Sequence, residues 1–130
     1  SNHGNFTSMA VVGGKPAIVF YHTTDLTLCY VVADDAGGIS WSGDPSVIDT
    51  GIAGSPTSSL IEINGRPAVA YYASSGSGDL KYAFQDALGD WQVMTVDALG
   101  NRGQYPSLRL VNGKPMISYQ NSTDADLMLA

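Results

Sequence analysis

The sequence predicts an all-β fold built from repeated antiparallel sheets, and three observations carry this prediction. The 130 residues include 15 Gly and 6 Pro scattered among Val, Ile, Tyr and Thr, a composition that favours strands over helices. Three segments show the same signals in the same order, and their prolines stand at positions Pro16, Pro67 and Pro115. Each segment also places a tight-turn dipeptide between two apolar runs, which is typical of a β-hairpin.

The first two strands of each repeat are expected to form that hairpin. The first strand ends at a dipeptide that tolerates the positive φ angles of a tight turn: Gly13-Gly14, Asn64-Gly65 or Asn112-Gly113. The second strand begins at the proline, where the loss of one N–H is least costly. It is apolar at successive positions, as in Ala17 to Tyr21, and this pattern predicts a sheet that is covered on both faces.

Two further strands are expected to complete each repeat. A polar loop leads to third strands that start at Leu28, Leu80 and Leu127. A turn containing Gly and Asp then leads to Trp41 or Trp91 and to a fourth strand through Ile48 or Val96. The third repeat reaches Leu129-Ala130 within its third strand, so we expect it to lack a fourth strand.

Four antiparallel strands that recur at steps of 51 and 48 residues, with both sheet faces apolar, indicate β-propeller blades. We expect one repeat domain, residues 1–130, with blades at about 4–53, 54–102 and 103–130. A β-sandwich is the competing all-β fold, but it would not require such a repeat. A closed propeller needs about four blades at least, so three blades predict about half of a ring of roughly six. The partner surface would come from a second copy, with a dimer favoured, or from further repeats of a longer chain.

Size, charge and cysteine content narrow the possible partners. Hydrophobic residues make up 44% and charged residues 14%, so the chain can bury a core. Six basic and twelve acidic residues give a formal charge of -6, which argues against nucleic acid and anionic lipid surfaces. No apolar run is long enough for membrane insertion, and the start of the chain shows no signal-peptide pattern. The single Cys29 excludes an internal disulfide.

The repeated motifs also carry a resemblance to known proteins. They comprise Ser59 to Tyr72, Gly103 to Gln120, Asp79 to Tyr82, and the turns Asp35 to Trp41 and Asp86 to Trp91. This set resembles tandem repeats of uncharacterised secreted and surface proteins of bacteria. The turns are similar to the Asp-box of sialidase-type propellers, although the first has one residue too many. The resemblance implies a propeller fold and a secreted or cell-surface location, and it implies no characterised chemistry.

The residues predict no catalytic site, cofactor or metal. A sialidase-like reaction would need an arginine cluster and a Tyr–Glu pair, yet Glu62 is the sole glutamate and Arg66 stands in a hairpin turn. The only candidate bases for a serine triad, His3 and His22, have no Gly-x-Ser-x-Gly motif to serve. The loop aspartates form no Asp-x-Asp-x-Asp-Gly calcium loop. We therefore expect a protein that is not an enzyme.

The candidate binding residues lie on the loops that precede first strands and join second to third strands. The matched position that reads His22, Ala73 and Asn121 differs in every repeat, as in binding loops on a common scaffold. Tyr105, which Phe6 matches, is an aromatic residue in the loop before the third repeat. The candidate ligand-binding residues are His22, Asp25, Asp79, Arg102, Tyr105, Asn121 and Asp124. The favoured function is non-catalytic recognition of a carbohydrate or a protein. A structural spacer or assembly unit of a larger surface protein is the alternative, and a propeller hydrolase ranks third.

Overall fold

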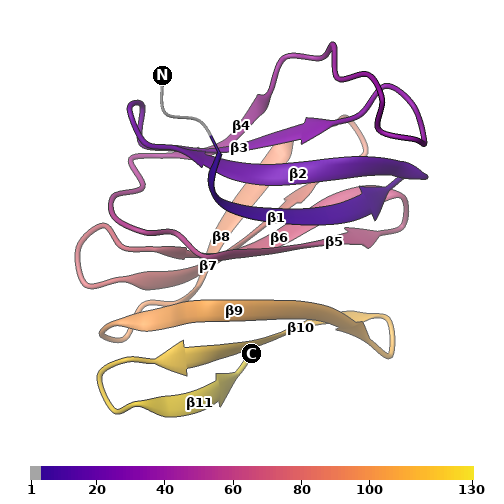
Figure 1. The fold of residues 1–130 in the computed structure, drawn as a ribbon. Helices are drawn as coiled ribbons and strands as arrows, with labels where there is room; N and C mark the ends of the chain where they lie inside the picture. The colour runs from indigo at the N-terminus through magenta and orange to yellow at the C-terminus, as the bar shows by residue number, and fades with distance from the viewer. Residues whose placement is uncertain (1–3) are drawn as a thin grey trace.

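The computed structural model describes residues 4–130, which form eleven β-strands and no helix (Figure 1). Three antiparallel sheets follow one another along the chain. Sheet 1 contains β1 (Asn5–Val12), β2 (Lys15–His22), β3 (Thr27–Val32) and β4 (Ser46–Thr50). Sheet 2 contains β5 (Ser58–Ile63), β6 (Arg66–Ala73), β7 (Asp79–Gln85) and β8 (Trp91–Asp97). Sheet 3 contains β9 (Arg102–Val111), β10 (Lys114–Asn121) and β11 (Asp126–Leu129). The all-β prediction is confirmed, with four strands in the first two repeats and three in the third.

The hairpin at the start of each sheet turns at two residues with positive φ angles, as the sequence predicts. Both turn residues of the second repeat have positive φ, 52° at Asn64 and 77° at Gly65, and the first and third repeats follow the same pattern. Two positive φ angles give the turn the twist of the flanking strands. Ile63 and Arg66 consequently pair directly, and residues 58–73 form the expected hairpin.

Three details differ from the sequence-based expectation. Trp41 lies in the loop between β3 and β4, whereas Trp91 opens β8. In the first repeat the Asp35 carboxylate accepts N–H groups from Gly37, Ile39 and Ser40, which holds a wide turn and delays the fourth strand until Ser46. Phe6 and Tyr105 belong to β1 and β9 rather than to loops, and Arg102 opens β9 instead of ending the second repeat.

The three sheets stack in chain order, with sheet 2 between the other two (Figure 1). Their first strands lie closest together, since β1 contacts β5 extensively and β5 and β6 contact β9, whereas β4 and β8 barely touch. Serine side chains link successive first strands. The Ser8 hydroxyl accepts the Leu60 N–H at 2.9 Å, and the matching Ser59 hydroxyl accepts the Leu108 N–H at 3.0 Å. The sheets therefore fan out from their first strands.

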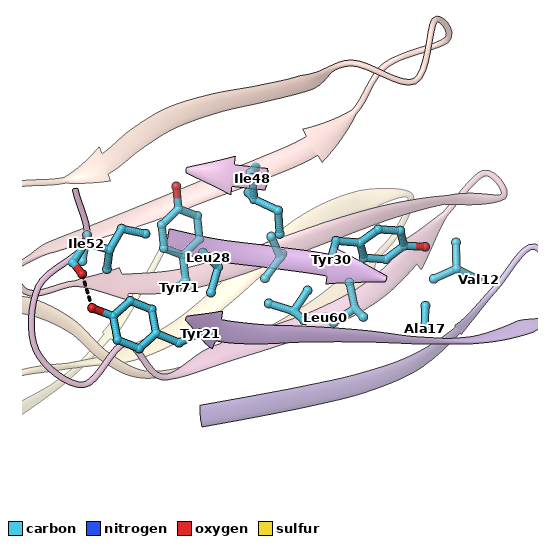
Figure 2. Packing of buried hydrophobic residues seen from close by; sticks show 13 residues of the cluster. Val12, Ala17, Tyr21, Leu28, Tyr30, Ile48, Ile52, Leu60 and Tyr71 are labelled. Atoms are coloured by element: carbon cyan, nitrogen blue, oxygen red, sulfur yellow. Dashed lines mark hydrogen bonds between the residues drawn. The ribbon is translucent and has the colours of Figure 1, made fainter. Parts of the chain in front are cut away.

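Two apolar clusters fill the two spaces between the sheets. Sheets 1 and 2 enclose the larger cluster, in which the Tyr21, Leu28 and Tyr71 side chains meet (Figure 2). Sheets 2 and 3 enclose a smaller one around Leu80 and Tyr119. We call the side of a sheet that faces the next sheet along the chain its forward face, and the opposite side its backward face. Only sheet 2 has both faces covered within the described chain, because alternate residues of β2 and β10 remain partly exposed.

Candidate functional site

Two matching aspartate networks join neighbouring sheets near the ends of their second strands. Asp49 of β4 accepts hydrogen bonds from Tyr71 at 2.7 Å and from Lys81 at 2.9 Å, both in sheet 2. Asp97 of β8 accepts hydrogen bonds from Tyr119 of sheet 3 at 2.7 Å and from Arg102 at 3.1 Å. Arg102, which the sequence analysis proposed as a ligand-binding residue, thus forms an ion pair with Asp97 within the fold.

The networks change the proton affinity of their members. Desolvation raises the pKa of Asp49, but hydrogen bonds from Lys81 and Tyr71 outweigh this effect and hold the pKa below its ordinary value. The pKa of Asp97 is lowered in the same way, with Tyr119 and Arg102 opposing desolvation. Burial and the neighbouring Asp97 carboxylate raise the pKa of Tyr119 to about 12. Both networks therefore hold a charged carboxylate and a neutral tyrosine at neutral pH.

Four further predicted residues pair with each other across short turns. The His22 Nδ1 atom lies 3.0 Å from Oδ2 of Asp25 in the turn between β2 and β3. The matching turn between β10 and β11 is closed by a 2.9 Å hydrogen bond from the Asn121 amide to Asp124. Asp79 opens β7 opposite Ala73. These side chains shape the turns on which they stand, and the structure does not gather them into one site.

Three of the predicted residues border hollows: His22 and Asp25 border one of about 200 Å³ on sheet 1, and Tyr105 borders another. The Tyr105 residue is 69% exposed, and it borders a hollow of about 190 Å³ at the loop ends of the first strands. All three sheets contribute to this hollow, which is lined by Phe6, Ser55, Thr57, Tyr72, Gln104 and Tyr105. We call it the aromatic hollow. None of its lining side chains is a carboxylate, an amine or a guanidinium, so it offers aromatic rings, hydroxyls and an amide to a neutral ligand.

Local backbone geometry directs two of the three aromatic residues of the hollow, Phe6 and Tyr105. Phe6 and Tyr105 have φ angles of 52° and 51°, in the left-handed region that glycine and asparagine adopt more readily. Each stands where the pairing of first and second strands shifts register. Such irregularities aim side chains away from a regular sheet and are common near functional sites. The Tyr105 N–H donates to Thr57 Oγ1 at 3.1 Å, which anchors this segment to sheet 2.

The hairpin face of the molecule has a larger hollow. It measures about 380 Å³ between sheets 1 and 2, and Gly13, Lys15, Gly65 and Pro67 are among its lining residues. The sole glutamate, Glu62 of β5, accepts the Gly13 N–H at 2.6 Å on this side. The hairpin turns of the three repeats are similar, each with a Gly followed by a basic residue and a Pro, although Gly13 stands where the other two repeats have Asn.

The described residues contain neither a cluster of metal ligands nor a membrane-spanning helix. Within residues 4–130, no three His, Cys, Asp or Glu side chains come close enough to hold a metal ion. This part of the chain contains no helix that could cross a membrane. His3, which the sequence offered as a candidate base, lies outside the described residues.

No protein family, characterised protein or solved structure matches this chain. Sequence reasoning singled out Tyr105 but missed Thr57, Tyr72 and Gln104 as its neighbours. The match between Phe6 and Tyr105 in the repeat was the available signal for pairing two aromatic residues. Thr57 occupies the same repeat position in sheet 2, so an alignment of the three repeats would also have pointed to it.

Proposed function

We propose that this chain is an arc of β-propeller blades that binds a neutral carbohydrate in the aromatic hollow, without catalysing a reaction on it. Three features support the propeller arrangement: sheets of chain-ordered antiparallel strands, their stacking face to face, and the close approach of their first strands. In such a fold the first strands surround the central axis. The aromatic hollow would then open at the mouth of that axis.

The observation that carries the binding proposal is the exposed Tyr105 side chain on a left-handed backbone. An aromatic residue at such a position costs the fold about 1 kcal/mol or more, and the exposed ring contributes little packing in return. A pyranose has one face of C–H groups and a rim of hydroxyls. The Tyr105 and Phe6 rings can stack on that face, while the Gln104 amide and the Thr57 hydroxyl can bind the rim.

The absence of an acid–base pair in the hollow favours binding over hydrolysis. Glycoside hydrolysis by the common route requires two carboxyl groups that flank the scissile bond. No Asp or Glu lines the aromatic hollow, and Tyr72, the buried ring beneath it, donates its hydroxyl to Asn101 at 2.7 Å. The lining groups are those of a recognition site.

A glycan array followed by calorimetric titration tests this function. We expect a subset of neutral oligosaccharides to bind, and Tyr105→Ala to weaken that binding about tenfold or more, because it removes the stacking ring. Tyr105→Phe should retain most of the affinity. Leu88→Ala serves as the matched control, since Leu88 is also exposed but lies on the turn before β8.

Two results would contradict the proposal. One is an array on which no neutral glycan binds the folded chain. The other is a bound glycan whose affinity is unaffected by Tyr105→Ala and by Phe6→Ala, because the ligand would then occupy another surface.

A second role, as an assembly unit, is supported by a separate observation. Large apolar side chains are exposed on the two outer sheet faces of the stack, among them Met9 and Val47 in sheet 1 and Leu127 and Leu129 in sheet 3. Exposed apolar surface of this kind commonly marks an interaction site. The two roles are compatible, since the aromatic hollow and the outer faces are different surfaces.

A further inference from the structure

The two outer faces of the stack are of opposite kinds. Sheet 1 presents its backward face, on which strand pairing places Met9 and Val11 beside Ile18 and Cys29 beside Val47. Sheet 3 presents its forward face, on which Leu127 and Leu129 of β11 flank Gln120 and Ser118 of β10. Inside the chain, each interface joins a forward face to a backward face. The outer faces are therefore the two halves of an interface that the molecule already uses twice.

The repeat allows individual positions to be compared across the three forward faces. Leu28, Leu80 and Leu127 occupy the same place, opposite Tyr21, Tyr72 and Gln120. Leu28 and Leu80 are 0% exposed because the next sheet covers them, whereas Leu127 is 83% exposed. Tyr30 and Leu129 form a second such pair, one buried and one exposed. On the forward face of sheet 3, β11 is thus as apolar as the matching strand of a covered face, whereas β10 carries Gln120 and Ser118 there.

The forward face of sheet 3 also has a hollow that corresponds to an occupied position inside the chain. It measures about 320 Å³ and lies between Tyr105, Gln120 and Leu127. At the matching place in sheet 1, Tyr21 and Leu28 contact Tyr71 of sheet 2 (Figure 2). Phe20 is the residue of sheet 1 that matches Tyr71 in the repeat. A Phe20 ring from a second copy would be of suitable size for this hollow. Tyr71 donates its hydroxyl to Asp49, whereas Phe20 has no hydroxyl and so requires no carboxylate on the opposite sheet.

Backbone contacts between the sheets extend the same correspondence. Ser8 and Ser59 accept N–H groups from Leu60 and Leu108 of the following sheet. Ser107 is the third serine of this series, and the N–H group that matches its donors is that of Met9 in sheet 1. An exposed hydroxyl on sheet 3 and a backbone donor on sheet 1 are thus in position for one more hydrogen bond of this type.

Gly103 and Gly4 give a further comparison between a covered and an uncovered position of the repeat. A Cβ atom on Gly103 would lie 2.6 Å from the Leu80 Cα of the preceding sheet, so this contact requires glycine. Gly4 matches Gly103 in the repeat and has a similar φ of 95°, yet nothing lies within 4 Å of its Cβ position in the single chain. If sheet 3 of a second copy packed on sheet 1 as sheet 2 packs on sheet 3, the Leu127 residue of that copy would lie opposite Gly4.

We propose that two copies of this chain associate head to tail, each placing the forward face of its sheet 3 on the backward face of sheet 1 of the other copy. Twofold symmetry makes the two seams equivalent and closes a ring of six sheets. The seams are largely apolar; Asp25 borders the hollow on sheet 1, Asp126 borders the hollow on sheet 3, and Arg109 stands on the edge strand β9. Because each copy carries a formal charge of -6, salt should strengthen the association by screening their mutual repulsion.

Sedimentation equilibrium of the 130-residue chain over a range of concentrations tests the proposal. We expect a species of twice the 13.6 kDa chain mass. Leu127→Asp and Met9→Asp should each raise the dissociation constant at least about tenfold, because each places a charge in both seams. Leu88→Asp is the control and should leave it unchanged, since Leu88 is 87% exposed on a turn away from both faces. Circular dichroism confirms that each variant is folded.

Cross-linking separates the head-to-tail arrangement from other dimers. On a Cys29→Ala background, chains with Met9→Cys and chains with Ser107→Cys should form a disulfide when mixed and oxidised, and neither should do so efficiently alone. A monomer at all concentrations, an open series of larger species, or a dimer weakened by only one of the two aspartate variants would overturn the proposal. These outcomes are independent of glycan binding.

Discussion

Sheet 2 and the two outer sheets are built from the same sequence pattern but are buried to different extents. Seven of the eight residues of β6 are buried, whereas burial alternates along β2 and β10. Val69 and Tyr71 of β6 pack on sheet 1, and Ala68 and Ala70 pack on sheet 3. The matching residues Ile18 and Phe20 of β2 stand on the backward face of sheet 1 and are only half-buried.

From this difference we infer that the apolar pattern of a repeat indicates which faces of its sheet are suited to packing. The pattern is present even where the single chain leaves such a face exposed. A strand of an independent two-layer protein would alternate apolar and polar residues. The outer strands keep apolar residues on the outward side, in β2 as Ile18 and Phe20 and in β11 as Leu127 and Leu129. Substitutions at matching positions of different sheets can measure what the neighbour contributes.

The largest expected difference is between Leu80 and Leu127. Leu80→Ala should lower the free energy of unfolding by about 3 kcal/mol, because it leaves a cavity between two sheets. Leu127→Ala should change it by less than about 0.5 kcal/mol in dilute solution, where the side chain is solvated. Urea denaturation monitored by tryptophan fluorescence gives both values. Equal losses would mean that Leu127 is already buried in the single chain.

Next in size is the effect of removing the Asp49 charge between sheets 1 and 2. Asp49→Asn should cost about 1 to 2 kcal/mol at neutral pH, because it weakens the hydrogen bonds from Tyr71 and Lys81. The matched control is Asp44→Asn, which changes an exposed loop aspartate and should alter stability by less than about 0.5 kcal/mol. Urea denaturation of both variants decides the comparison.

The same carboxylates predict how stability depends on pH. The pKa values of Asp49 and Asp97 lie below 3.8 in the fold, so their stabilisation is present above pH 3.8 and is lost as pH falls through the lowered values. Tyr119 acts in the alkaline range, where its raised pKa means that stability falls as pH rises from 10 towards about 12. Asp49→Asn should flatten part of the acid limb, and because the Asp49 carboxylate also helps to raise the pKa of Tyr71, it should make the alkaline limb less steep. An acid limb identical to that of the unsubstituted chain would contradict the role given to Asp49.

The smallest expected effect on stability is at Tyr105. Tyr105→Gly should leave the free energy of unfolding unchanged or raise it by up to about 1 kcal/mol. Glycine adopts the left-handed backbone without strain, which stabilises the fold, and its greater entropy in the unfolded chain offsets part of this gain. The same variant should lose glycan binding. Leu26→Gly, at another left-handed position, should be similarly neutral for stability and retain binding. A large loss of stability in Tyr105→Gly would assign the ring a packing role instead.

Much of the fold could be predicted from local signals. The Gly-Gly and Asn-Gly turns and the prolines after them located all three hairpins, and the repeat separated the sheets to within a residue or two. Less of the candidate site could be predicted. His22, Asp25, Asn121 and Asp124 were chosen because loop polar residues often bind ligands, but the structure pairs them within their own turns. Whether a polar side chain is satisfied by a neighbour depends on turn geometry that the residue types leave open.

By itself, the sequence determined the strand content, the order of the sheets and the need for apolar neighbours, because periodicity and turn chemistry act over a few residues. Tertiary structure alone decided which tyrosines meet carboxylates and which aromatic rings share a hollow. Tyr71 and Asp49 are 22 residues apart and belong to different sheets, and Phe6 and Tyr105 come from opposite ends of the chain. Such contacts depend on how closely the sheets approach, which the packing of all the side chains between them decides.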